Sequence, residues 1–300
     1  MNDNAESPDT QFEFVDWLQN LLFISMIRVL RWLPYEKRLA AMGWASKNVV
    51  GPLSGYRRRA RKNLKLIYPD KPQEERGEIA DKVLENFGRG IMENYSHKEF
   101  REKIKEMKIE GPGLEAARAA QAEGRPIIFT SGHYSNHEAT RTALDLAGFK
   151  VGGLYKPASN RYFNAHYVET GAVVSGPVFP LGKAGTVQFF RFLKKGGQGF
   201  LLHDVYVHGA QHIDFLGKPA RTAVSAAELV LKLNGVLIPY FNTRQPDGVS
   251  FKIELLDPIP ASDARTMTVE LVRLLEERIH EDPSQWLWIH RRWKGVPGAA

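Results

Sequence analysis

Residues 126–138 read PIIFTSGHYSNHE, and the pattern of this stretch decides the fold. Residues 126–130 form a short apolar run bounded by a proline and a glycine, which predicts a buried strand. A helical pattern begins directly afterwards, over 136–147. A buried strand that turns at once into a helix is typical of α/β proteins with parallel strands.

The same alternation continues to the end of the chain. We expect further strands at 150–154, 173–180, 199–204 and 236–243, an edge strand at 250–255, and helices at 160–170, 185–195, 224–234 and 268–280. Residues 34–122 read as helices, with clear examples at 74–95 and 113–123. The sequence therefore predicts an α/β fold with a single, largely parallel or mixed sheet flanked by helices and a helical N-terminal membrane-associating extension. The expected parts are a disordered tail (1–13), a helical N-terminal region (14–122), the α/β core (123–294) and a closing tail (295–300).

Composition narrows the function classes. The chain has 300 residues, 43% hydrophobic and 25% charged, a balance that excludes a disordered, collagen-like or polytopic membrane protein. It has no cysteine, which excludes disulfides, zinc–thiolate sites, iron–sulfur clusters and thiol nucleophiles. Forty-one Lys and Arg residues against 34 Asp and Glu residues give a net charge of +7. This excess predicts an acidic partner, either nucleic acid or an anionic membrane surface.

Residues 14–33, FVDWLQNLLFISMIRVLRWL, are the most hydrophobic part of the chain. Asp16, Arg28 and Arg31 interrupt the run and fall on one side of a helix, opposite an apolar side. We therefore expect a helix that lies in the membrane interface rather than one that spans the bilayer. The alternative is a helix that packs on the protein's own core.

A basic cluster follows at residues 56–65, YRRRARKNLK. Nucleic-acid binding would require interleaved aromatic residues or a recognition-helix pattern, and the sequence shows neither. Basic residues close to an interfacial helix favour contact with anionic lipid, and a solvated helix face is the alternative. The cluster is interpreted as a membrane contact, with no nucleic-acid partner.

His133 and Glu138 are the candidate catalytic residues. In a loop that turns into a helix, the two side chains can converge, so that the carboxylate fixes the tautomer of the imidazole that takes a proton. The pattern G-x-S-x-G is absent, so such a base would act on a nucleophile that the substrate supplies. The alternative is structural, because Ser135 and Glu138 have the spacing of a helix capping box.

A metal-dependent hydrolase is a second class of function. Three histidines and Asp204 lie within residues 203–212, and His133 and His137 have an i, i+4 spacing. Against this class, the sequence H-E-x-x-H is absent, and two of the histidines lie in a glycine-containing loop without helical register. Loose clusters of this kind are more often solvated.

A series of ordered motifs resembles the late acyltransferases of lipid A biosynthesis, the lauroyl/myristoyl transferase family within the lysophospholipid acyltransferase-like group. The resemblance covers residues 21–294. Its markers are LPY at 33–35, RKNL at 61–64, NFGR at 86–89 with Glu93, H-x4-D/E at His133 and Glu138, YKP at 155–157 with Asn160, LLHD at 201–204, FLG at 215–217 and QWLWIHRRWK at 285–294. The H-x4-D/E motif alone is weak, whereas the closing block together with the others in order is specific.

The resemblance implies that His133 is the general base and Glu138 its partner. It implies an acyl thioester on acyl carrier protein as donor and a hydroxyl of a lipid A precursor, a glycolipid, as acceptor, without a cofactor or a bound metal. It also implies that the protein works at the cell inner membrane, on its cytoplasmic face. Acylation of another glycolipid or of a lysophospholipid is the alternative reaction. A basic membrane-surface protein without catalysis is the non-enzymatic alternative.

Further residues are expected to bind the substrate. Lys156, Asn160 and Arg161 would lie at the end of the next strand and are candidates to bind phosphates or sugar hydroxyls. Asp204 ends a buried strand, where an unpaired carboxylate would be costly, so we expect it to support the other residues.

The chain departs from the family in two places. Some members carry an arginine after a glycine where Gly171 and Ala172 stand here, so Arg161 or Arg244 is expected to replace it. The N-terminal apolar segment is shorter than in many members and is interrupted by charge. Interfacial attachment is therefore expected to replace a transmembrane anchor.

Overall fold

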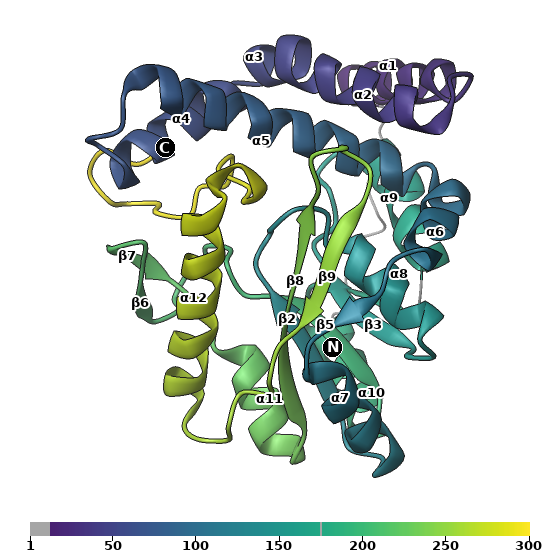
Figure 1. Ribbon diagram of the computed structural model, residues 1–300, viewed down its shortest axis with the longest axis vertical. Coiled ribbons are helices and arrows are strands. Elements are labelled where there is room, and N and C mark those ends of the chain that lie inside the picture. Colours follow the sequence, from purple (N-terminus) through teal and green to yellow (C-terminus); the bar gives the residue numbers. More distant parts are fainter. Residues whose placement is uncertain (1–12, 175) are drawn as a thin grey trace, which may run out of the picture.

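The computed structural model describes residues 13–174 and 176–300 and centres on a seven-stranded sheet (Figure 1). The strands lie in the order β1 (Ile109–Glu110), β9 (Phe251–Leu255), β8 (Val236–Arg244), β2 (Ile127–Ser131), β5 (Gln198–Leu202), β3 (Val151–Tyr155) and β4 (Val178–Pro180). Neighbouring strands are parallel except for the antiparallel pair β8 and β9. The predicted α/β fold with a largely parallel sheet is thus confirmed.

Helices cover both faces of this sheet. They are α7 (Gly113–Ala122) and α8 (Glu138–Leu146) on one face, and α10 (Lys183–Lys194), α11 (Ser225–Leu233) and α12 (Ala264–Glu281) on the other. Strand β2 explains the arrangement, because all five of its residues are buried. Ile127 and Phe129 pack with α7 and α8, whereas Ile128 packs with α10 and α11. A strand buried on both faces needs a continuous apolar run, which is what the sequence supplies.

The N-terminal third of the chain is helical. It comprises α1 (Phe14–Leu30), α2 (Tyr35–Ala45), a π-helical segment (Ser46–Val50), α3 (Gly51–Leu53), α4 (Tyr56–Ile67), α5 (Gln73–Asn94) and α6 (His97–Lys105). Figure 1 shows α1 to α5 lying across one end of the molecule, at the end of the sheet toward which β8 points. Helix α9 (Arg161–Val174) contacts α1 and α8. Across the described residues, no helix has both the length and the apolarity needed to cross a bilayer.

Two expectations about the strands need correction, and one pair of strands was missed. The strand expected at 173–180 begins only at Val178, because α9 continues to Val174. The strand at 250–255 is not at the edge, because the two-residue strand β1 pairs with its outer side. A hairpin of β6 (His212–Phe215) and β7 (Lys218–Arg221) was not expected. Of the predicted tail at 1–13, residues 1–12 lie outside the described residues.

Candidate active site

The carboxyl ends of strands β2, β5 and β3 open into a cavity of about 900 Å³. In open α/β sheets this edge is where ligands bind. His133, which follows β2, lines the cavity together with Glu138 and Arg141 at the start of α8 and Lys156 beyond β3. Three of the residues proposed from the sequence, His133, Glu138 and Lys156, therefore line one cavity.

Asp204 is the carboxylate that contacts the His133 imidazole. Its Oδ1 lies 2.7 Å from His133 Nδ1, and its Oδ2 accepts hydrogen bonds from the His133 backbone N–H at 2.7 Å and from Trp286 Nε1 at 2.8 Å. The register of the sheet produces this pairing, because Ser131 of β2 lies opposite Leu202 of β5. Two residues further along, the two parallel strands therefore place His133 beside Asp204.

The charge of Asp204 fixes the form of the imidazole. Burial alone would raise the pKa of this carboxyl, but the opposing charge of His133 and its hydrogen bond outweigh burial, and the pKa is well below its usual range. An ionised carboxylate only accepts hydrogen bonds, so Nδ1 of His133 carries a hydrogen. In the neutral ring, Nε2 is then the nitrogen that can take a proton.

Gly132 allows this carboxylate to approach. A Cβ atom at that position would lie 2.5 Å from a methyl carbon of Leu275 and 3.0 Å from Asp204 Oδ2. Any side chain would therefore displace either the carboxylate or the helix α12 behind it. The glycine before His133 in the sequence has a packing role in the site.

Glu138, the predicted partner of His133, lies in a different ion pair. Its carboxylate oxygens accept from Arg141 Nη1 at 3.2 and 3.4 Å, and its Oε1 lies 3.6 Å from His137 Nε2. The capping box is not formed, because Asn136 Oδ1 rather than Ser135 accepts the backbone N–H of Glu138, at 3.1 Å. Glu138 thus lines the cavity with Arg141, while Asp204 holds the imidazole.

The loop between β2 and α8 is held in place by the closing block of the chain. The Ser135 N–H donates to the carbonyl of Gln285 at 2.7 Å, and the Leu287 N–H donates to the carbonyl of His133 at 3.0 Å. Ser135 has a φ of 56°, a left-handed conformation that is uncommon for a residue with a side chain. These backbone bonds tie the loop that carries His133 to residues 285–287 of the closing block.

A buried ion pair supports the same loop from the other side. Glu93 of α5 and Arg244 at the end of β8 form a bidentate pair, at 2.5 and 2.8 Å. Glu93 Oε2 also accepts from Asn136 Nδ2 at 2.8 Å, and Asn242 Nδ2 donates to the carbonyl of Asn136 at 2.7 Å. Arg244, a predicted substrate-binding residue, is engaged in this network and is not among the described residues that line the cavity.

The other predicted substrate-binding residues separate into two groups. Lys156 lines the cavity. Asn160 joins α9 to α1, because its Nδ2 donates to the carbonyl of Asp16 at 2.8 Å and its Oδ1 accepts from the Phe163 N–H at 3.0 Å. Arg161 donates to the Tyr162 hydroxyl at 2.9 Å. Neither Asn160 nor Arg161 is among the described lining residues of this cavity.

The sequence analysis missed Arg141, a buried cation at the cavity wall. Its Nη2 donates to the carbonyl of Gly176 at 3.3 Å, and its Nη1 contacts Glu138. Arg141 stands eight residues after His133 in the sequence.

Three further imidazoles surround His133. The ring of His290 packs edge-to-face against it at 4.5 Å between centroids, and that of His137 at 6.0 Å. His203 is buried beside Thr130, at 3.2 Å from its hydroxyl. Burial lowers the pKa of each of these three histidines to about 4, so they are neutral near pH 7. Within the described ranges, no three His, Asp or Glu side chains are arranged to hold a metal ion.

The fold and the site define a class of protein: an α/β enzyme whose His–Asp pair lies at the carboxyl edge of a largely parallel sheet and faces a large cavity. The sequence pattern of the bacterial lipid A biosynthesis acyltransferase family matches residues 8–295, and the chain belongs to this family. The protein is therefore an acyltransferase of lipid A biosynthesis.

Individual relatives agree with this assignment. The chain is 25% identical over 244 residues to the lipid A biosynthesis lauroyltransferase of Escherichia coli K12, an alignment that covers 79% of this chain and 78% of that protein. It is 24% identical over 280 residues to a lipid A biosynthesis acyltransferase of Haemophilus influenzae, covering 89% and 85%. A lipid A biosynthesis palmitoleoyltransferase of Escherichia coli K12 is 21% identical over 243 residues, covering 79% and 78%.

Proposed function

We propose that the protein transfers an acyl chain from a thioester on acyl carrier protein to a hydroxyl of a lipid A precursor, with His133 as the general base. The observation that carries this proposal is the contact of His133 Nδ1 with Asp204, which leaves Nε2 as the basic atom. A base without a serine or cysteine nucleophile of its own suits direct attack by the acceptor hydroxyl. Family membership supports the lipid A acceptor.

The reaction follows from this arrangement. His133 Nε2 takes the proton of the acceptor hydroxyl as its oxygen attacks the thioester carbonyl carbon, and a tetrahedral oxyanion forms. When this intermediate collapses, the carbon–sulfur bond breaks, and the leaving thiolate takes the proton from the imidazolium. Asp204 stabilises the positive imidazolium between the two steps. General-base assistance of this kind contributes about 10²–10⁴-fold to the rate.

The cavity has an apolar part and a positively charged part, which suit the two substrates. Apolar side chains of the sheet edge and the following segments line part of it, among them Leu154, Phe200 and Val207. We assign this part to the acyl chain, because burying each methylene stabilises by about 0.8 kcal/mol. Arg141 and Lys156 line the same cavity and supply positive charge for the anionic groups of the acceptor.

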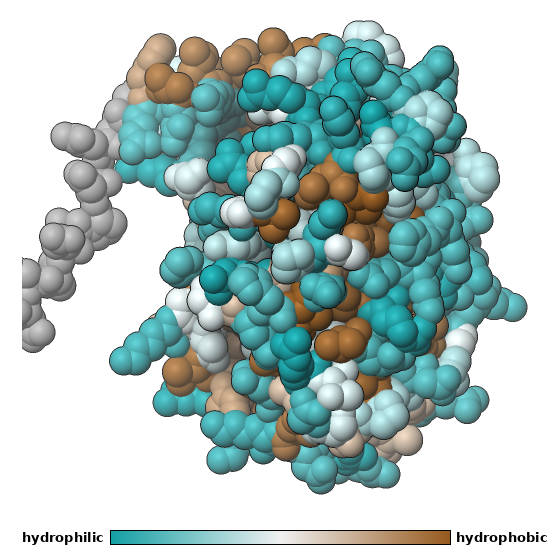
Figure 2. All heavy atoms as spheres, turned by 90° about the vertical axis from the view of Figure 1, so that its left-hand side faces the viewer, coloured by the Kyte–Doolittle hydropathy of each residue, from teal (hydrophilic) through white to brown (hydrophobic). Residues whose placement is uncertain are grey.

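We further propose that the protein works on an anionic membrane surface, at the cytoplasmic face of the inner membrane. Helix α1 packs one side on the protein, where Asn20 Oδ1 lies 2.7 Å from His166 Nε2 of α9, whereas Arg28 and Arg31 are exposed. Apolar residues of its other side are exposed, namely Val15, Leu22 and Val29. Trp32 in the turn after α1, Trp44 in α2 and Leu53 in α3 are exposed as well. Figure 2 shows hydrophobic side chains gathered along the edge of the molecule where α1 to α3 lie in Figure 1. Exposed apolar patches of this kind mark interaction surfaces.

Helix α4 adds positive charge beside this apolar surface. Arg58, Arg61, Lys62 and Lys65 are exposed on it at helical spacing. Basic residues near an anionic membrane stabilise binding by about 1 kcal/mol each. Part of α1 does pack on the core, because Ile27 is buried in a cluster with Leu39 and Met42 of α2. The helix therefore has one packed side and one apolar exposed side, as an interfacial helix requires.

A reconstituted transfer assay tests the reaction. The purified protein is mixed with acyl-loaded carrier protein and either a lipid A precursor or a lysophospholipid, and the products are analysed by mass spectrometry. We expect one acyl chain to be added to the lipid A precursor, and we expect His133→Gln to abolish the addition. Turnover by His133→Gln at the wild-type rate would contradict the mechanism. Acylation of the lysophospholipid alone would contradict the proposal that a lipid A precursor is the acceptor.

A further inference from the structure

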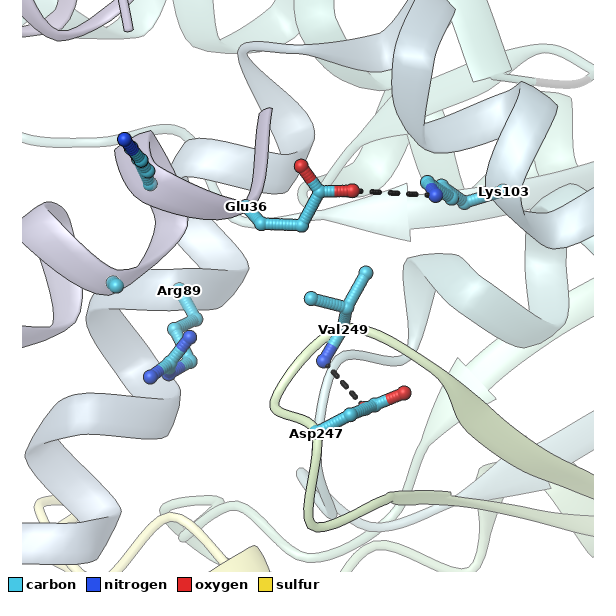
Figure 3. Close-up of a pocket in the computed structure, with 7 residues that line it drawn as sticks. Glu36, Arg89, Lys103, Asp247 and Val249 are labelled. Carbon is cyan, nitrogen blue, oxygen red and sulfur yellow. Dashed lines mark hydrogen bonds and ion pairs between the residues drawn. The ribbon is translucent and has the colours of Figure 1, made fainter. Parts of the chain in front are cut away.

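A second cavity, of about 460 Å³, lies between α2, α5, α6 and the turn that joins β8 to β9. Figure 3 shows its residues, with Glu36 and Lys103 joined on one side and Asp247 and Val249 on the turn opposite. His133 and the other cavity-lining residues of the catalytic site are not among the residues that line it. Three of its lining residues are cations, Lys37, Arg89 and Lys103, and two are carboxylates.

Both carboxylates are already engaged. Glu36 pairs with Lys103 at 3.3 Å, and its pKa is lowered by a hydrogen bond from its own backbone N–H and by that lysine. Asp247 accepts the backbone N–H groups of Val249 and Ser250, each at 2.9 Å, and the Ser250 hydroxyl at 2.6 Å. The turn therefore holds the Asp247 carboxylate within itself.

Arg89 is a cation whose guanidinium has N–H donors left for a ligand. Its guanidinium is half-buried, and its hydrogen bond to the carbonyl of Gly248 is long, at 3.5 Å. Burial and the nearby charge of Arg244 lower its pKa. The neighbouring carboxylates are bound elsewhere: Glu85 pairs with Lys47 at 2.8 Å, and Glu93 forms the bidentate pair with Arg244. An added anion would offset the repulsion between the two guanidinium groups.

We propose that this second cavity binds a phosphate group, held by Arg89 with Lys37 at its rim. The planar fork of a guanidinium matches the oxygens of phosphate, and an ammonium group adds a point charge. The phosphate comes either from free inorganic phosphate or from a phospholipid headgroup. Helix α2 links the second possibility to the membrane surface, because it lines the cavity through Ala40 and exposes Trp44 in the apolar patch.

The proposed site lies next to the ion pair that supports the catalytic loop. Arg89 lies one turn before Glu93 on α5, and the Glu93–Arg244 pair holds Asn136 in the loop that carries His133. A phosphate bound to Arg89 would offset the repulsion between the Arg89 and Arg244 guanidinium groups.

Two variants test the site in the full-length protein. Arg89→Gln removes the guanidinium, and Ala40→Glu places a carboxylate in the cavity from an exposed helical position while Arg89 stays. Arg118→Gln is the control with the same loss of charge, because Arg118 is exposed and its helix α7 lies at the opposite end of the molecule from α2 (Figure 1). One arm measures binding of inorganic phosphate by titration calorimetry. The other arm measures binding to vesicles of phosphatidylcholine with and without phosphatidylglycerol.

We expect Arg89→Gln and Ala40→Glu each to weaken binding by about tenfold or more in at least one arm, as the loss of a charge-assisted hydrogen bond predicts. Loss in the phosphate arm assigns the site to free phosphate, and loss in the vesicle arm alone assigns it to a lipid headgroup. Binding equal to wild type and Arg118→Gln in both arms overturns the proposal. If Arg89→Gln does not fold, as judged by circular dichroism, Ala40→Glu decides alone.

Discussion

His133 Nδ1 and Asp204 Oδ1 lie 2.7 Å apart, although 71 residues separate them in the chain. The same carboxylate accepts the Trp286 indole N–H, so three distant segments meet on one buried group. Asp204 has no exposed side-chain surface, and three N–H groups point at its two oxygens. The position of the imidazole therefore depends on an acceptor that can take all three hydrogen bonds.

Asp204→Asn is expected to lower kcat by about 10²–10⁴-fold, the range of a general-base contribution. An amide offers one oxygen, and its NH₂ group would face one of the three donors, so the Nδ1–H tautomer of His133 loses its support. The measurement is the initial rate of acyl transfer at saturating donor. Because the two residues act as a unit, the double variant with His133→Gln should lose no more activity than His133→Gln alone. A near-wild-type rate in Asp204→Asn would refute the pairing.

Glu138 and Arg141 should behave as a second unit. Glu138→Gln removes the charge that orients the Arg141 guanidinium, and Arg141→Gln removes the guanidinium itself, so each should raise the KM for the acceptor by about tenfold. The double variant should lose about as much as either single variant, because both remove the same contact. Steady-state kinetics of all three variants completes the cycle. Additive losses would show that the two residues act independently.

Arg244→Met is expected to destabilise the fold by about 3–5 kcal/mol, the cost of leaving a buried charge without its partner. Both Arg244 and Glu93 are buried, and removal of one leaves the other uncompensated. Urea unfolding followed by circular dichroism measures the loss. The variant Glu93→Gln with Arg244→Met should recover part of it, since no unpaired charge then remains. An unchanged midpoint with a raised KM would instead favour substrate binding by Arg244.

The sequence predicted most of the sheet because its strands are buried. A strand covered on both faces, such as β2, needs an unbroken apolar run, and a run of that kind is visible in a single sequence. The strand β1 was missed because two residues carry no periodic pattern. The β6–β7 hairpin was missed because its turn places Leu216 as well as Gly217 at positive φ, and of these two residues only the glycine favours that conformation.

The sequence offered His133 as a candidate base, but it did not contain the pairing of this residue with Asp204. His133 was found because it follows a buried strand, and the spacing to Glu138 was visible in the chain. The contact with Asp204 depends on β5 lying next to β2 and on the register of Ser131 with Leu202. Strand order is a tertiary property, so spacing along the chain does not contain it. Arg141 was not predicted for the same reason, because only its position at the cavity distinguishes it from other arginines on helices.

We expect the exposed apolar residues of α1 and of the turn after it to contribute to membrane binding. Trp32 is 87% exposed and Val29 57%, and insertion of such side chains into a bilayer interface would bury most of their apolar area. The double variant Val29→Glu with Trp32→Glu is expected to lower partitioning onto anionic vesicles by about tenfold or more in a sedimentation assay. Val269→Glu on α12, also partly exposed, is the control that should keep binding. Equal sedimentation of all three proteins would contradict the surface.

The buried histidines predict how stability depends on pH. Burial lowers the pKa of His203 from 6.5 to about 4, so between these values the unfolded chain binds a proton that the folded chain does not. Stability therefore falls as the pH drops from about 6.5 to about 4. His137 and His290, with pKa values lowered to about 4, act in the same direction. The lowered pKa of Asp204 affects stability only at more acidic pH. Its stabilising contribution is present above the ordinary pKa of 3.8 and is lost as the pH falls below that value.

His203 alone should account for about 2 kcal/mol of the loss between pH 7 and pH 5, since each unit of pKa shift corresponds to about 1.4 kcal/mol. Urea unfolding at the two pH values measures the difference. His203→Asn should make the dependence shallower by about this amount, because it removes one of the three titrating imidazoles while His137 and His290 remain. Thr130→Val is the matched control, since it removes the hydroxyl 3.2 Å from His203 Nδ1 but leaves the buried imidazole. It should lower stability at both pH values and keep the slope. A His203→Asn variant with the wild-type slope would show that this imidazole is not the group that titrates on unfolding.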